Sequence, residues 1–209
     1  TIGAGSGGSL DIQGEIRDFR ISQSALYTTA STSTGTDVFS TTLPTSSLPN
    51  VSSTILRTCN LPYFADTSAS PRTITQTGDA KTVPSGPYDY STANASDGGS
   101  IGFNGSEVFN ISSSSDFAFA NDDYTIDLWA KPLISQSGRT DLVLDFGTDS
   151  TLRIDDGVFK YYPPSGSTPE LYNTGSGPVP AGIWSFLSIA RTSGVTRMFL
   201  NGVMKSKNT

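Results

Sequence analysis

Residues 123–130 read Asp-Tyr-Thr-Ile-Asp-Leu-Trp-Ala, and this stretch decides the fold class. Its apolar side chains recur at every second position from Tyr124 to Ala130, which is the period of a β-strand with one buried face. We therefore expect a strand that packs this face against a core. The carboxylates of Asp123 and Asp127 fall together on one face, and we expect a solvated strand face there.

Tight-turn dipeptides join other alternating stretches into hairpins. Asp156-Gly157 and Asn201-Gly202 each stand between two short runs of alternating apolar and polar residues. Both dipeptides readily adopt the positive φ that two-residue hairpin turns require. A further strand is expected over residues 184–191, so the C-terminal half predicts antiparallel hairpins.

The composition favours strands and turns over helices. The chain has 209 residues with 21 Gly and 12 Pro, and long stretches are rich in Ser and Thr. These residues disfavour helix interiors, and nothing in the sequence resembles a βαβ unit. Short strands bounded by turns predict an all-β protein in which two antiparallel sheets pack into a sandwich.

Three segments follow from the pattern of strands and linkers. Residues 1–27 contain a strand candidate at 15–21, residues 28–53 form a Ser, Thr and Pro-rich linker or loosely docked strap, and residues 54–209 carry the main sandwich. The apolar side chains available to pin the later part of the strap are Val38, Phe39, Leu43 and Leu48.

The residue types needed for most catalytic sites are missing. The sequence has no His, which removes the commonest general base and metal ligand and every Ser-His or Cys-His nucleophile. Glycoside hydrolysis needs paired carboxylates, and the pair at Asp123 and Asp127 is interpreted as part of a solvated face. No Gly-rich phosphate loop occurs. We predict no catalytic residue, no cofactor and no enzyme activity.

Four aspartates raise the question of calcium, which needs only oxygen ligands. They surround two tight connections, but they lack the regular spacing and the terminal Glu of a calcium-binding hand. We interpret them as exposed turn residues and predict no metal. The four are Asp145, Asp149, Asp155 and Asp156.

Charge, hydropathy and cysteine content exclude other classes. The chain has 13 Lys and Arg against 19 Asp and Glu, and no basic run suited to a phosphate backbone, so no nucleic-acid partner is expected. No apolar run approaches the roughly 20 residues of a membrane span, so no membrane insertion is expected. The single Cys59 is expected to be a small buried hydrophobe beside Leu56 and Leu61.

Aromatic residues provide the one candidate binding site. Tyr161, Tyr162 and Tyr172 surround a polar loop, where flat rings are suited to stacking on a sugar. The alternative is that these rings alternate between faces, some packing in the core and some bracing the loop. Trp129 and Trp184 are expected within strands as packing residues, with Trp184 a core anchor.

Several motifs together resemble a known fold family. In chain order they are residues 97–101 (Asp-Gly-Gly-Ser-Ile), 123–129, 184–191 and 199–202 (Phe-Leu-Asn-Gly). Their order resembles the laminin-G-like, concanavalin A-like jelly roll. The variant repeated in tailed-phage virion proteins is the most similar, because its closing strand reads Gly-x-Ile-Asp-Asp-Phe-Arg-Ile followed by Ala-x-Tyr. Residues 14–21 and 25–27 resemble that pattern.

The resemblance implies a function through surfaces. It implies a non-enzymatic structural or adhesive module of a phage virion appendage or surface protein, located on the virion or outside the cell. Its partners would be other virion or surface subunits in an oligomeric assembly, and a host-surface glycan. The Glu-x-Asp-x-Glu strand of the family's enzymes is absent, so hydrolase activity does not transfer. The alternative is a carbohydrate-binding lectin module of a secreted bacterial protein, with Tyr161, Tyr162 and Tyr172 as its sugar platform.

The strand order looks rotated relative to the family. The strand that resembles the closing strand stands near the beginning of the chain and not at its end. We predict that residues 16–21 pair antiparallel with residues 54–60 of the same chain, as in a circular permutant. Two alternatives remain open: residues 1–48 are the tail of a preceding repeat, or they donate their strand to a neighbouring subunit.

Overall fold

The computed structural model describes residues 1–3, 12–27, 43–88, 99–119, 121–133, 140–147, 151–162, 171–172 and 178–208. Over these ranges the protein is all-β, and every strand pair is antiparallel. A short 3-10 helix, η2 (Ser115–Phe117), is the helical element of the described part. No helix there is long and apolar enough to cross a membrane.

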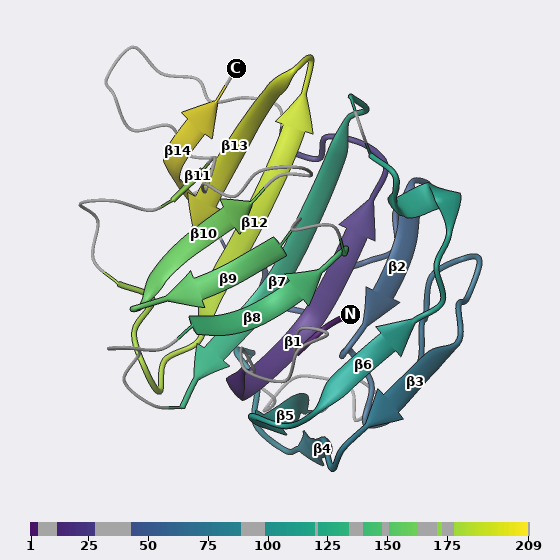
Figure 1. The fold of residues 1–209 in the computed structure, drawn as a ribbon, viewed down its shortest axis with the longest axis vertical. Helices are drawn as coiled ribbons and strands as arrows, with labels where there is room; N and C mark the ends of the chain where they lie inside the picture. The colour runs from purple at the N-terminus through teal and green to yellow at the C-terminus, as the bar shows by residue number, and fades with distance from the viewer. Residues whose placement is uncertain are drawn as a thin grey trace.

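The larger sheet has eight strands in the order β14-β13-β12-β7-β1-β5-β4, with β2 also paired to β1 (Figure 1). Its strands are β1 (Gln13–Ser22), β2 (Thr54–Thr58), β4 (Lys81–Val83), β5 (Ser100–Asn104), β7 (Tyr124–Pro132), β12 (Ser185–Thr192), β13 (Val195–Leu200) and β14 (Val203–Asn208).

Two smaller sheets supply the remaining strands. One contains β8 (Thr140–Asp145), β9 (Thr151–Asp155), β10 (Val158–Tyr162) and β11 (Leu171–Tyr172), and the other contains β3 (Ile74–Thr77) and β6 (Val108–Ile111). Figure 1 shows β8, β9 and β10 crossing in front of β12, β7 and β1.

The first residues of the chain join the two smaller sheets. Ile2 forms bridges to Phe109 of β6 and to Leu144 of β8. Its amide donates to the Phe109 carbonyl at 3.0 Å, and the Gly3 amide donates to the Val143 carbonyl at 3.2 Å. Ile2 is fully buried, so it is a packed part of this layer.

One apolar core lies between the large sheet and the smaller sheets. The face of β7 with Ile126 and Leu128 packs into it, as the alternating sequence predicts, and meets Ile154 and Phe159 from β9 and β10. All four side chains are fully buried. We call the opposite side of the eight-stranded sheet its outer face.

The predicted hairpin turns are confirmed by their backbone angles. Asp156 and Gly157 between β9 and β10 have φ of 50° and 76°, and Asn201 and Gly202 between β13 and β14 have φ of 50° and 80°. Positive φ at both central residues matches the right-handed twist of the flanking strands. The residues at each turn therefore determine these two-residue connections between strands.

Strand β1 lies inside the large sheet with partners on both sides. It pairs with β7 along one edge, while on the other edge Ile16 is opposite Ile101 of β5 and Phe19 is opposite Thr58 of β2. The predicted antiparallel pairing of residues 16–21 with residues 54–60 of the same chain is confirmed for residues 19–21, whereas Ile16 pairs with β5. The change of partner occurs at Asp18, whose φ is 51° and beside which the register to β7 shifts.

The two tryptophans differ in how deeply they are buried and in whether they lie in a strand. Trp129 of β7 is 5% exposed, as expected for a packing residue. Trp184 was expected inside a strand and in the core, but it precedes β12 and is half-buried, so that prediction is wrong. The fully buried ring of this strand belongs to Phe186. Cys59 is 1% exposed, as predicted, and burial raises the pKa of its thiol to about 12.

Candidate functional site

The outer face of the eight-stranded sheet carries buried charges, and this corrects the expectation of a solvated face. Asp127 is completely buried, although Asp123 at the start of the stretch is exposed. The reason lies far away in the sequence, because residues within 24–27, 43–51 and 84–88 contact this face. An alternating pattern cannot reveal such a cover, since it reports only which side chains share a face.

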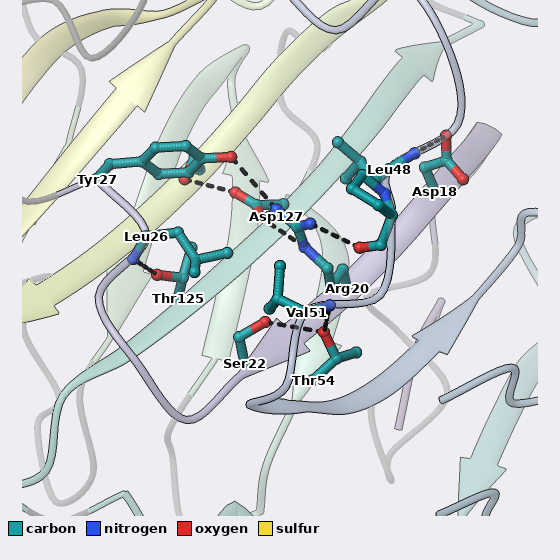
Figure 2. Close-up of polar contacts among 12 residues, drawn as sticks. Asp18, Arg20, Ser22, Leu26, Tyr27, Leu48, Val51, Thr54, Thr125 and Asp127 are labelled. Carbon is teal, nitrogen blue, oxygen red and sulfur yellow. Dashed lines mark hydrogen bonds and ion pairs between the residues drawn. The ribbon is translucent and has the colours of Figure 1, made fainter. Parts of the chain in front are cut away.

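Arg20 and Asp127 form the central ion pair under this cover (Figure 2). The guanidinium donates from Nε and Nη2 to Asp127 Oδ2 at 3.1 and 2.6 Å. Ser188 Oγ donates to Asp127 Oδ1 at 2.8 Å, and Arg20 also donates to the Pro49 carbonyl at 2.9 Å. Both carboxylate oxygens are therefore occupied by donors from β1 and β12, and the same arginine holds the strap.

Burial and pairing act on this pair in opposite directions. Burial is the largest effect on Asp127 and raises its pKa, while Arg20, Ser188 and Tyr27 act to lower it. Burial acts to lower the pKa of Arg20, but attraction to Asp127 outweighs it and the net shift is upward. Arginine remains protonated in proteins, so Asp127 is the titrating member of the pair.

Asp18 organises a second polar cluster at the point where β1 changes partner. Its carboxylate accepts hydrogen bonds from Ser47 Oγ at 2.7 Å, from the Leu48 amide at 3.2 Å and from the Tyr88 hydroxyl. Arg17 Nε lies 3.6 Å from the same carboxylate, and neither side chain is exposed. Asp18 thus binds two segments that cover the outer face.

An apolar cluster lies beside these charges under the same cover. Trp129 and Phe186 project from the sheet, and Leu48 and Tyr88 close over them. Leu43 packs at the edge of this cluster. Among the described strap residues, 43–53, Leu48 is the buried side chain that anchors the strap to the sheet. Val38 and Phe39 lie outside the described residues.

Glu15 and Lys131 form a third pair near the end of β7. Lys131 Nζ donates to Glu15 Oε1 at 2.8 Å, and Ser85 and Ser100 donate to Oε2. Burial acts to raise the pKa of Glu15, but these partners outweigh it and the net shift is downward. The Lys131 ammonium also lies 5.7 Å from the centre of the half-buried Trp184 ring.

The predicted sugar platform is divided between two environments. Tyr161 is 4% exposed in the core, and its hydroxyl hydrogen-bonds to that of Tyr124 at 2.8 Å. Tyr162 is on the opposite side of β10 and is half-buried. The backbone of Tyr172 pairs in register with Lys160. The loop from 163 to 170 lies outside the described residues.

Charged side chains surround Tyr162. The Arg153 guanidinium lies 4.5 Å from the centre of its ring. Asp155 accepts from Lys160 Nζ at 3.1 Å and from the Tyr162 hydroxyl at 3.4 Å. Asp155 is 9% exposed, so its interpretation as an exposed turn residue is wrong. The sequence pattern did not single out Arg153 and Lys160, although the hairpin register places them opposite each other, on the same side of the hairpin as Tyr162.

The other turn aspartates differ in position. Asp145 is half-buried and caps the Gly147 amide at 2.6 Å, Asp156 is exposed, and Asp149 lies outside the described residues. Within the described ranges, no group of three or more His, Cys, Asp or Glu side chains is placed to hold a metal ion.

No protein-family model, curated protein or solved structure matches this chain.

Proposed function

We propose that this chain is a non-enzymatic structural and adhesive module of a phage virion appendage or surface protein, acting in particle assembly and in attachment to a host surface. The state of Asp127 is the observation that supports the non-enzymatic part of this proposal. A glycosidase needs carboxylates that reach its substrate. Asp127 is fully buried, and both of its oxygens accept hydrogen bonds inside the fold.

The same proposal includes the finer architecture. We take the layers to be a concanavalin A-like jelly-roll sandwich in circularly permuted strand order. The pairing of β1 with β2, β5 and β7 of its own chain supports this order, because the strand finds partners along both of its edges within the chain. The core between the layers supports a single sandwich.

Hydrolysis assays test the non-enzymatic part. We expect no reducing sugar to be released from β-glucans above a buffer blank. Release that disappears in Asp127→Asn but persists in Asp79→Asn, a change at an exposed aspartate, would contradict the proposal.

Cell-binding measurements test the adhesive part. The fluorescently labelled chain should attach to the surface of at least one strain in a panel of intact bacteria, and excess unlabelled chain should compete with it. The heat-unfolded chain is the matched control. Equal binding of folded and unfolded chain across the panel would exclude attachment by the folded surface.

A second candidate is a carbohydrate-binding lectin module of a secreted bacterial protein. The observation that favours it is the half-buried Tyr162 ring beside charged and polar side chains of β9 and β10. Aromatic rings with nearby polar groups are suited to sugars, which present both C–H faces and hydroxyls.

A further inference from the structure

The outer side of the β9–β10 hairpin carries buried polar atoms without hydrogen-bond partners. Leu152 and Ile154 pack into the core, so Thr151, Arg153 and Asp155 face the other way. Among the described residues, Thr151 Oγ1, Arg153 Nε and Asp155 Oδ1 are all buried and accept or donate no hydrogen bond. A buried polar group that is left unsatisfied destabilises a fold.

These atoms lie on three successive outward positions of one strand. The neighbouring strand places Tyr162 opposite Thr151 and Lys160 opposite Arg153. We call these five residues the hairpin face. Arg153, Lys160 and Tyr162 are partly exposed, so a ligand can reach their outer atoms. The polar atoms of Thr151 and Asp155 lie deeper, at 4% and 9% exposure of their residues.

The two cations of the hairpin face differ in whether a carboxylate neutralises them. Lys160 is neutralised by Asp155 at 3.1 Å. Arg153 has its guanidinium against the Tyr162 ring, and no carboxylate of the described residues forms an ion pair with it. The chain as a whole has a net charge of −6. Arg153 is therefore a local cation on an acidic protein, placed where an anionic group can pair with it.

The chemistry of these groups selects a class of ligand. A guanidinium binds a carboxylate through two parallel hydrogen bonds. The ammonium of Lys160 and the hydroxyl of Tyr162, both on partly exposed residues, suit sugar hydroxyls, and the Tyr162 ring suits the C–H face of a pyranose. The geometry points to the hairpin face as a binding site for a saccharide that carries a carboxylate, which rests on the proposed attachment to a surface glycan.

Two pairs of probes separate the carboxylate from the rest of the sugar. Trigalacturonic acid is compared with its fully methyl-esterified form, and sialyllactose is compared with its methyl ester at the sialic acid carboxyl, by isothermal titration calorimetry. We expect at least one acid to bind about tenfold or more tightly than its neutral partner. The pair that shows the difference identifies the sugar as a uronic or a nonulosonic acid.

Variants locate the site. Arg153→Gln should weaken binding of the acid about tenfold or more, and Arg153→Lys should restore part of it, because the charge returns without the two parallel hydrogen bonds. The matched control is Lys207→Gln, which removes one positive charge from the exposed end of β14 and should leave binding unchanged. Far-ultraviolet circular dichroism and melting temperature establish that each variant is folded.

The outcomes distinguish this inference from the proposed function. Equal binding of acid and neutral probes, no binding of either acid, or unchanged binding in Arg153→Gln overturns the acidic-saccharide site. If the wild-type chain nevertheless attaches to intact bacteria, the attachment function stands and only the site is wrong. If it attaches to no strain while binding the acid, the attachment function fails and the site stands.

Discussion

At the scale of single residues, Asp127 and Glu15 show that the surroundings of a carboxylate decide what it does. Both side chains lie on the outer face of the large sheet, and both are covered by distant segments. Each has a cationic partner, Arg20 for Asp127 and Lys131 for Glu15. Replacing Asp127 should therefore lower the free energy of unfolding, whereas replacing Glu15 should change how stability depends on pH.

Replacing Asp127 by Ala should strongly destabilise the fold. The change leaves the Arg20 guanidinium buried without its charge partner, and breaking such a pair costs about 3–5 kcal/mol. Urea unfolding measures the loss in free energy of unfolding. Asp79→Ala is the control, because Asp79 is 75% exposed in a surface pair, and it should change stability little.

The double variant Arg20→Met with Asp127→Leu isolates the reason for that loss. Because neither charge remains, the double variant should be more stable than Asp127→Ala alone. A double variant that is less stable would show that the loss comes from packing and not from the unpaired charge.

Replacing Glu15 by Gln should flatten the pH dependence of stability. The folded chain holds the pKa of Glu15 below its ordinary value of 4.5. Ionised Glu15 therefore stabilises the fold above that value, and the contribution is lost as the pH falls through the lower folded pKa. Melting temperatures between about pH 3 and 6 should show a shallower slope for the variant. Parallel curves would contradict this.

At the scale of elements, β12 and the strap form one packed unit across the sheet. Phe186 of β12 is fully buried beneath Leu48 and Tyr88, whereas Trp184 lies at the edge of the same cluster and is half-buried. Because Phe186 is completely buried and Trp184 is not, we expect Phe186 to contribute more to stability than the larger ring.

The two aromatic residues of this unit should respond unequally to truncation. Phe186→Ala should cost about 3–5 kcal/mol in free energy of unfolding, and Trp184→Ala should cost clearly less, because its ring keeps contact with water in the folded state. Chemical denaturation of both variants provides the comparison. A loss from Trp184→Ala equal to or above that from Phe186→Ala would contradict the packing described.

Strap docking should depend on Leu48. The side chain is 4% exposed and packs in the outer-face cluster, so Leu48→Ala should lower stability by about 2–5 kcal/mol. It should also increase proteolytic cleavage between residues 43 and 51 under native conditions. Ser46→Ala, at an exposed strap position, is the control. Equal cleavage rates in the two variants would exclude a pinning role for Leu48.

At the scale of the whole molecule, β1 holds the large sheet together. One edge of this strand is bonded to β7, and the other is shared by β5 and β2. Without it, the half of the sheet formed by β7, β12, β13 and β14 would have no hydrogen-bonded connection to β2, β4 and β5. Nine of its ten residues are buried.

Hydrogen exchange should show this central position. Amides of β1 and β7 that are bonded in the sheet should exchange only by global unfolding, and amides of the edge strand β14 should exchange faster by local opening. Nuclear magnetic resonance or mass spectrometry measures the rates residue by residue or peptide by peptide. Faster exchange in β1 than in β14 would indicate a strand that docks loosely, as a strand from a preceding repeat would.

The sequence by itself determined the local features of this protein. Alternation at residues 124–130 predicted a strand and its core face, and the Asp-Gly and Asn-Gly dipeptides predicted hairpins, because both signals depend on neighbours within a few residues. The pairing of β1 with β2 was also predictable, since residues 14–21 resemble a closing strand that needs a partner. The aromatic pattern indicated both Tyr161 and Tyr162 as sugar-binding candidates, but it did not show that Tyr161 is buried in the core.

Only the tertiary structure decided which faces are covered. Arg20 and Asp127 are 107 positions apart, and their burial depends on the strap and the segment near Tyr88 crossing the sheet. The joining of β6 and β8 through Ile2 and the polar hairpin face around Arg153 likewise arise from contacts between distant segments. A linear pattern records which side chains share a face, whereas the tertiary packing of remote segments decides whether that face meets water, another part of the chain or a ligand.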